Sequence, residues 1–280
     1  MSNTSTTTSG GAKTSGEYEN NPFFVATNGL DLLFKRAQSI GILTAVIAGL
    51  SALSSLPSAF VPAETNEPTQ STVSSNAGEI PTIPAEIWLT IILIVLVLLV
   101  VFSFIGIVVR GVLDYTAAKL ARGEGATISE AFRAVFSNFW SYTWVLVIVS
   151  VKTFLWSLLF VVPGIIMSVR YSLAGVAYFD KQLKGDASVQ HSSALVKNAW
   201  LTTFASQNLL NLITLGIIQP LLTPGTNGIL YRQLGAASEV KPKAHFLSWL
   251  TLILPIILFG LIILGVVLLG FALANYSQTV

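Results

Sequence analysis

Long apolar segments, separated by short polar ones, dominate this chain. A helix needs about 20 predominantly apolar residues to cross a hydrocarbon core about 30 Å thick. Three segments meet this requirement without any Asp, Glu, Lys or Arg, at 37–63, 87–109 and 246–274. In 87–109, Leu, Ile and Val would occupy every face of a helix, which is typical of contact with lipid. The pattern therefore predicts an all-α integral membrane protein.

The region from 139 to 236 is also apolar, but two Pro-Gly pairs interrupt it. Proline disfavours a helical residue before it, and glycine permits a reversal of the chain. We therefore expect hairpin turns at Pro163-Gly164 and Pro224-Gly225. The predicted fold is a polytopic bundle of six or seven membrane helices, at about 38–61, 86–112, 140–162, 164–180, 201–222, 224–236 and 247–274. The segment 224–236 is short enough to be re-entrant, and the alternative to the second hairpin is a single span over 201–222.

A repeated motif divides the same region into two similar units. Ala134, Asn138, Trp140 and Thr143 recur 60 residues later as Ala194, Asn198, Trp200 and Thr203. This spacing predicts an internal duplication, with copies at about 127–180 and 187–235. Each copy opens with an amphipathic helix, and Thr127 with Glu130 has the spacing of a capping box at the start of the first. Two such helices would lie in the headgroup plane or pack on the end of the bundle.

Composition supports a membrane location and predicts a separate polar tail. Hydrophobic residues make up 53% of the 280-residue chain and charged residues only 10%, whereas soluble domains carry about 25% charged residues. Residues 1–30 are Ser/Thr-rich, so we expect a disordered cytoplasmic tail there and a helical membrane domain over 31–280. The net charge of +2 gives no support to nucleic-acid binding.

Basic residues follow the positive-inside rule when both hairpins are present. All of the 15 Lys and Arg residues except Lys152 and Arg170 then lie in cytoplasmic segments, and the external loop 64–86 carries glutamates and no basic residue. We therefore expect seven crossings, with the N-terminus in the cytoplasm and the C-terminus outside. A single span over 201–222 would instead return the C-terminus to the cytoplasm.

Lys152 and Arg170 lie inside predicted spans and are the candidate functional residues. Ionisable side chains within a membrane are costly, and no Asp or Glu lies in the interior of any predicted span to pair with these two. One interpretation is a cationic pocket that contacts an anionic headgroup or a substrate. The other is that both side chains reach an interface or bond to carbonyls at helix breaks. Trp140, Trp200 and Trp249 are expected to be interfacial anchors.

No pattern typical of an enzyme or a metal site is present. The chain has no cysteine, and its two histidines, His191 and His245, have no metal-type partner at ligand spacing. Phosphate-binding loops, zinc-protease motifs and the serine elbow of hydrolases are also absent. We therefore expect no catalytic residue, no metal and no cofactor.

The stretch VVPGIIMSVRYSLAGVAYFDKQLKGDASVQHSSALVKNAWLTTF (161–204) and the later ILYRQL (229–234) carry a family resemblance. They resemble a broad family of uncharacterised prokaryotic polytopic membrane proteins, which includes the membrane domain of some bacterial glycerophosphodiester phosphodiesterases. The resemblance covers roughly residues 86–235 and implies a location in a prokaryotic plasma membrane. No catalytic barrel is present, so the resemblance carries over no catalytic residue, and 246–274 adds an apolar helix to its pattern.

These features favour a non-enzymatic multi-pass membrane protein with a structural, accessory or membrane-homeostasis role. Its expected partners are membrane lipids, a second copy of the chain or another subunit of a membrane complex. The alternative is a small-molecule or ion transporter or channel with a pocket near Lys152 and Arg170. The duplication and the interrupted helices favour that alternative, whereas the absence of acidic residues from the predicted spans speaks against it.

Overall fold

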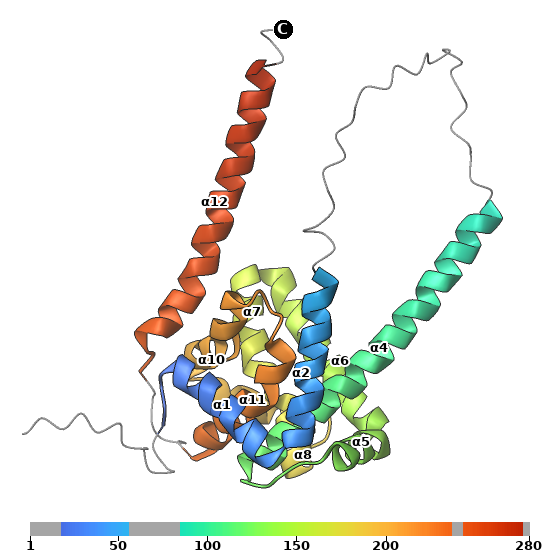
Figure 1. The fold of residues 1–280 in the computed structure, drawn as a ribbon, viewed down its shortest axis with the longest axis vertical. Coiled ribbons are helices and arrows are strands. Elements are labelled where there is room, and N and C mark those ends of the chain that lie inside the picture. Colours follow the sequence, from blue (N-terminus) through green and yellow to red (C-terminus); the bar gives the residue numbers. More distant parts are fainter. Residues whose placement is uncertain (1–17, 56–84, 237–242, 277–280) are drawn as a thin grey trace, which may run out of the picture.

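The computed structural model describes residues 18–55, 85–236 and 243–276, and every regular element in these ranges is a helix. The helices are α1 (Pro22–Arg36), α2 (Gln38–Ser55), α4 (Ala85–Ala121), α5 (Ile128–Ser137), α6 (Phe139–Leu159), α7 (Val161–Tyr171), α8 (Ala174–Lys181), α9 (Asp186–Val196), α10 (Trp200–Ile213), α11 (Gln219–Ala236) and α12 (Phe246–Tyr276). Figure 1 shows their arrangement.

In the described ranges, four segments are long and apolar enough to cross a membrane: Ile87–Ala121, Phe139–Leu159, Val161–Lys181 and Phe246–Phe271. The described part of α2 is apolar but shorter, and residues 56–61 of the predicted first span lie outside the described ranges. α10 would extend about 21 Å at 1.5 Å per residue. The predicted all-α fold with apolar helices of spanning length is confirmed, and the count of six or seven crossings stays a prediction.

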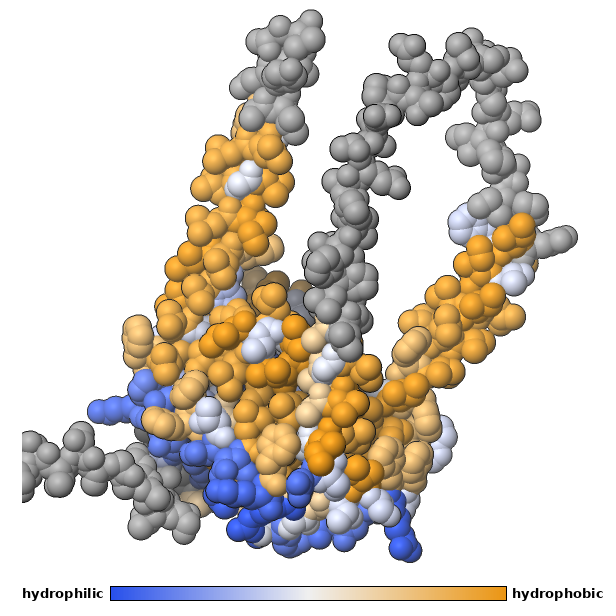
Figure 2. Space-filling model, viewed as in Figure 1, coloured by the Kyte–Doolittle hydropathy of each residue, from blue (hydrophilic) through white to orange (hydrophobic). Residues whose placement is uncertain are grey.

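The helices form a packed base, from which α4 and α12 project on the same side (Figure 1). We define this helical base as α1, α5 to α11 and the last 15 residues of α4. Its largest fully buried side chains include Leu33, Leu120, Tyr142, Leu173 and Leu230. Figure 2 shows hydrophilic residues gathered at the end of the base opposite the projecting helices, whose visible surfaces are hydrophobic. The molecule is therefore polarised along one axis.

Helix α1 lies where a disordered tail was expected, so that prediction is wrong for residues 22–30. The side chain of Asn21 accepts a hydrogen bond from the backbone N–H of Phe23 and caps the helix, and Pro22 occupies the first turn. Val25 and Leu33 are buried against the rest of the base. Tertiary packing on α11 therefore stabilises a helix in a segment of polar composition. Residues 1–17 of the predicted tail lie outside the described ranges.

The chain reverses twice between α6 and α11, but neither reversal lies at a Pro-Gly pair. The first lies at the extended residue Phe160, and Pro163 is the third residue of α7. Proline fits this position because first-turn N–H groups have no partner within a helix. The second lies at residues 214–218, where Leu215 and Gly216 have positive φ. α10 and α11 are therefore separate helices, as the hairpin interpretation requires, but Pro224-Gly225 lies inside α11 and not at the turn.

The two predicted copies contain the same order of elements. α5 is followed by α6 and α7, and α9 is followed by α10 and α11. In each copy the break between the first two helices falls at the repeated asparagine, Asn138 or Asn198. The order agrees with a duplication, which stays a prediction. α9 is not confined to a surface, because its Ser188, Val189 and Ser192 are buried.

The capping box at the start of α5 is present and supports a testable prediction. The Thr127 hydroxyl accepts a hydrogen bond from the backbone N–H of Glu130 (3.3 Å), and the Glu130 carboxylate accepts one from the N–H of Thr127 (3.4 Å). Thr127→Ala is expected to lower the free energy of unfolding by about 1 kcal/mol. Denaturation in detergent micelles measures it, with Ser129→Ala on the same turn as the control. Equal effects of the two substitutions would contradict a capping role.

Candidate functional site

Asp114 is a fully buried acidic residue in the second half of α4. Its Oδ2 accepts hydrogen bonds from Nε of Arg110, one turn earlier (3.1 Å), and from the Tyr142 hydroxyl on α6 (2.8 Å). Its Oδ1 is buried and has no partner among the described residues. A buried carboxylate requires a counter-charge and hydrogen bonds, and Arg110 and Tyr142 supply them. The expectation that the membrane helices contain no acidic residue is therefore wrong for α4. This helix continues nine residues beyond its predicted end at 112 and so includes Asp114.

Helix α8 approaches this carboxylate so closely that only glycine fits at the contact. A Cβ atom added to Gly175 would lie 1.9 Å from Oδ2 of Asp114. The peptide backbone of α8 consequently closes the far side of the ion pair, and α4, α6 and α8 meet there. The close packing explains how a charged group becomes fully buried in the base.

Arg110 connects the buried ion pair to a polar cavity of about 90 Å3. Its Nη2 donates to the backbone carbonyl of Ser172 (3.1 Å), and its side chain is 41% exposed. The cavity is lined by Arg110, Ser172, Gln207, Asn208, Gln219, Leu222, Thr223, Thr226 and Asn227. These residues come from α4, α10, α11 and the α7–α8 junction. We call this cavity the Arg110 pocket.

Hydrogen bonds between uncharged side chains hold the walls of the Arg110 pocket together. The Gln207 amide donates to Oδ1 of Asn227 (2.8 Å) and to the hydroxyl of Ser172 (3.1 Å). Beneath them, the Ser192 hydroxyl accepts from the N–H of Leu173 and donates to the carbonyl of Arg170. The α7–α8 junction, α10 and α11 are therefore fixed relative to one another by polar contacts, which apolar packing alone would not orient.

Lys152 and Arg170 have separate local partners, and neither lines the Arg110 pocket. The Lys152 ammonium forms an ion pair with Asp186, the first residue of α9. Arg170 lies in the last turn of α7, and its Nη1 contacts the sulfur of Met167 at 3.6 Å. The structure thus gives Lys152 an acidic partner from outside its own helix, which the linear order of the spans did not indicate.

The Lys152–Asp186 ion pair predicts a pH-dependent contribution to stability. The hydrogen bond from Lys152, with a second from Gln190, lowers the pKa of Asp186 below its ordinary value of 3.8. The stabilisation is therefore fully present above pH 3.8 and is lost as the pH falls through the folded-state pKa. Because both side chains are partly exposed, we expect less than about 1 kcal/mol.

The measurement compares the wild type with Asp186→Asn in acid titrations of unfolding in micelles. The variant is expected to be less stable at neutral pH, and the gap should close below pH 3.8. Gln190→Ala removes only the second hydrogen bond and is the control with a smaller gap. A stability difference between the two proteins that stays constant from neutral pH to about pH 2 would exclude the ion pair as its origin.

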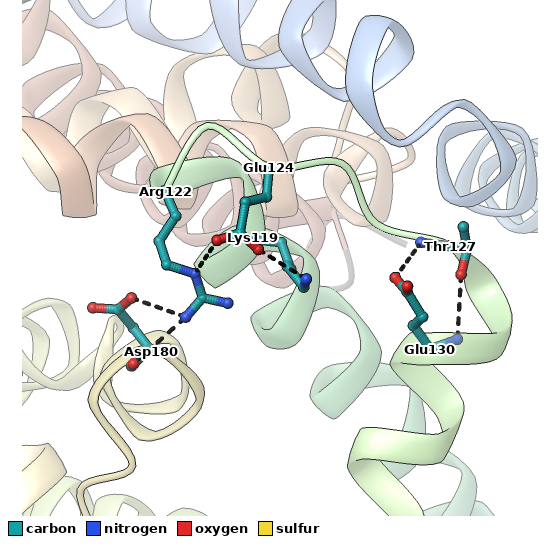
Figure 3. Close-up of polar contacts among 6 residues, drawn as sticks. All are labelled: Lys119, Arg122, Glu124, Thr127, Glu130 and Asp180. Atoms are coloured by element: carbon teal, nitrogen blue, oxygen red, sulfur yellow. Dashed lines mark hydrogen bonds and ion pairs between the residues drawn. The ribbon is translucent and has the colours of Figure 1, made fainter.

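A second charged cluster fixes the hydrophilic end of the base (Figure 3). Lys119 (2.8 Å) and Arg122 (3.1 Å) both contact the carboxylate of Glu124, and Arg122 also reaches Asp180 at the end of α8 (3.3 Å). The hydrogen bond from Lys119 lowers the pKa of Glu124. The N–H of Ala126 donates to the carbonyl of Arg36. This cluster joins α1, α4 and α8 and serves as a structural connection.

The three predicted anchor tryptophans differ in exposure. Trp140 is 82% exposed and Trp249 50%, and their role as interfacial anchors stays a prediction. Trp200 is partly buried against the core, so packing accounts for much of its surface. Exposed Trp144 lies one turn after Trp140 and extends the same face of α6.

Sequence reasoning missed the Arg110 pocket because its residues come from four separate segments. One local signal was present: Arg110 and Asp114 stand four residues apart directly after an apolar run, the spacing at which side chains on a helix pair. Within the described ranges there is no group of three His, Cys, Asp or Glu side chains that could hold a metal ion. The donors and acceptors of the pocket favour binding of a small polar group.

No family model matches the chain, and no curated protein or solved structure matches it either. The resemblance to the prokaryotic polytopic family therefore stays a prediction.

Proposed function

We propose that this chain is a non-enzymatic multi-pass membrane protein with a structural or accessory role in a prokaryotic plasma membrane. The observation that carries the proposal is the unpaired apolar surface of α4 and α12. From Ile87 to Ile105, and over most of α12, large apolar side chains are exposed on every face. A soluble protein does not expose surface of this extent, whereas lipid tails or partner helices would cover it.

The direction of the helices supports a topology with the N-terminus in the cytoplasm. α2 and α12 begin near the base, α4 ends in it, and all three extend toward the side opposite the hydrophilic end (Figures 1 and 2). If that end faces the cytoplasm, α2 and α12 cross outward and α4 crosses inward. α6 and the α7–α8 pair form the next two crossings. α10 and α11 add two more or form a re-entrant pair, and either arrangement places the C-terminus outside.

Single-cysteine labelling tests this topology, because the chain contains no native cysteine. A cysteine at Lys243, before α12, is expected to react with a membrane-impermeant maleimide only after the cells are opened. A cysteine at Lys35 is the matched cytoplasmic position at the end of α1. Labelling of position 243 in intact cells would overturn the proposed orientation.

Native mass spectrometry tests the accessory role by reporting subunits and lipids together. The protein, released gently from its membrane, is expected to carry bound lipid, a second copy or another membrane subunit on the projecting helices. Val97→Ser and Phe259→Ser place polar groups on the exposed faces of α4 and α12 and are expected to reduce that association. Recovery of a bare monomer from both the wild type and these variants would contradict the proposal.

A second candidate function, a small-solute carrier, is supported by the Arg110 pocket. Carriers place their binding sites beside interrupted helices within the membrane region. Here the pocket adjoins the α7–α8 junction and the two helices α10 and α11. A carrier would take up a labelled solute into proteoliposomes, whereas an accessory protein would not. A transport measurement therefore distinguishes the two candidate functions, whereas a binding measurement does not.

A further inference from the structure

The lining of the Arg110 pocket is electrostatically one-sided. Arg110 is its one charged member, and the other lining residues are neutral amides, hydroxyls and a leucine. Asp114 lies behind the guanidinium and contacts Nε, not the cavity. Nε donates to Asp114 and Nη2 donates to the carbonyl of Ser172. The guanidinium of Arg110 thus borders an otherwise neutral polar space.

Because Asp114 is the counter-ion of Arg110, the empty pocket contains no unpaired charge. Asp114 neutralises Arg110 in the absence of any ligand, and Tyr142 supports the carboxylate from the other side. A buried, unpaired arginine would be strongly unfavourable in this region. A ligand with negative charge would meet a neutral ion pair, so its binding should be reversible. This property suits release as well as capture.

Thr226 provides an independent observation that points to a ligand. Its side chain is 1% exposed, lines the pocket, and has a hydroxyl with no hydrogen-bond partner among the described residues. A buried hydroxyl without a partner destabilises the protein, and a bound ligand would satisfy it. Its neighbour Asn227 uses Oδ1 to accept from Gln207, which leaves the Nδ2 donors for the cavity. Donors therefore converge on the pocket from α4 and α11.

The size of the pocket admits a small polar group. Its volume of about 90 Å3 is well above the roughly 10–15 Å3 that one water molecule needs. A carboxylate or phosphate group fits this space. Arginine recognises both oxyanions through two parallel N–H donors.

We propose that the Arg110 pocket binds one small oxyanion group, a phosphate or a carboxylate, through the guanidinium of Arg110 with the Thr226 hydroxyl as a second donor. The group belongs either to a soluble anion or to the headgroup of an anionic lipid. The proposal goes beyond the accessory role. Its failure would leave the lipid and subunit association measured by native mass spectrometry unchanged.

The test uses the full chain in neutral detergent and measures the thermal unfolding midpoint against ligand concentration. Sodium phosphate and sodium acetate are the soluble probes, sodium chloride at equal ionic strength is the salt control, and glycerol is the uncharged probe. Nanodiscs of phosphatidylcholine with and without phosphatidic acid form the lipid arm. We expect phosphate, acetate or phosphatidic acid to raise the midpoint with a saturating dependence. Stabilisation by free anions identifies a soluble ligand, and stabilisation by phosphatidic acid alone identifies a headgroup.

Thr226→Val is the decisive variant, because it removes the unpartnered hydroxyl and keeps the shape of the side chain. It is expected to leave the unliganded protein at least as stable as the wild type and to weaken anion binding roughly tenfold. Thr203→Val is the matched control: Thr203 is also fully buried with an unpartnered hydroxyl, but it does not line the pocket. Arg110→Lys keeps the charge, loses the planar fork and is also expected to weaken binding.

Three results would overturn the proposal. The first is an equal rise of the midpoint with glycerol or with chloride. The second is equal anion affinity of the Thr226→Val and wild-type proteins. The third is the absence of stabilisation by all three oxyanion probes. A loss of affinity confined to Thr226→Val and Arg110→Lys, with Thr203→Val unchanged, supports it.

Discussion

Asp114→Ala is expected to lower the free energy of unfolding by about 3 kcal/mol, because it leaves the Arg110 guanidinium without its counter-ion. Breaking a fully buried ion pair costs about 3–5 kcal/mol, and the low end applies here since Arg110 is 41% exposed. The Tyr142 hydroxyl also loses its acceptor. Chemical denaturation in detergent micelles, followed by helix content, measures the difference from the wild type.

Two further variants separate the charge from the hydrogen bond. Tyr142→Phe removes one hydrogen bond to the carboxylate and is expected to cost about 1.5–3 kcal/mol, less than Asp114→Ala. The double variant Arg110→Met with Asp114→Leu removes both charges and is expected to recover most of the lost stability. If the double variant were as unstable as Asp114→Ala alone, volume and not charge would be the cause.

The buried ion pair shows what the hydrophobic pattern can and cannot predict. The apolar run of α4 was correctly identified as a long membrane-type helix. Its end was placed at about residue 112, shortly after the uncharged run 87–109. In the structure the helix continues to Ala121, since the base supplies partners for the polar residues Asp114 and Lys119. Partners from distant segments, such as Tyr142, are not visible in one-dimensional patterning.

The α10–α11 turn shows a second limit of the sequence pattern. A Pro-Gly pair is a frequent reversal signal, and Pro224-Gly225 was predicted as the turn. The structure instead reverses eight residues before Pro224, where Gly216 supplies a left-handed conformation. Pro224 is compatible with a helix interior at the cost of one backbone hydrogen bond. The glycine beside it has a packing role that local conformational rules do not reveal.

That role concerns α1, which packs along α11. A Cβ atom added to Gly225 would lie 1.9 Å from the carbonyl oxygen of Gly29, and one added to Gly29 would lie 2.6 Å from the backbone N of Thr226. The two helices therefore touch through their backbones, as small residues allow in membrane helix pairs. The polar composition of residues 1–30 concealed this contact, because α1 becomes stable only when α11 is present to bury Val25 and Leu33.

Gly225→Ala is accordingly expected to destabilise the base by about 3 kcal/mol, the upper end for overpacking, because backbone atoms cannot move aside as a side chain can. The free energy of unfolding in micelles measures this loss, and protease cleavage within α1 is expected to become faster as that helix separates. Gly235→Ala, ten residues later on α11, is the matched control: nothing lies within 4 Å of an added Cβ atom there, so better helix propensity should stabilise it by up to about 1 kcal/mol. The two substitutions are therefore expected to change the free energy of unfolding in opposite directions, because only Gly225 contacts α1. Changes in the same direction would mean that α1 does not pack on α11.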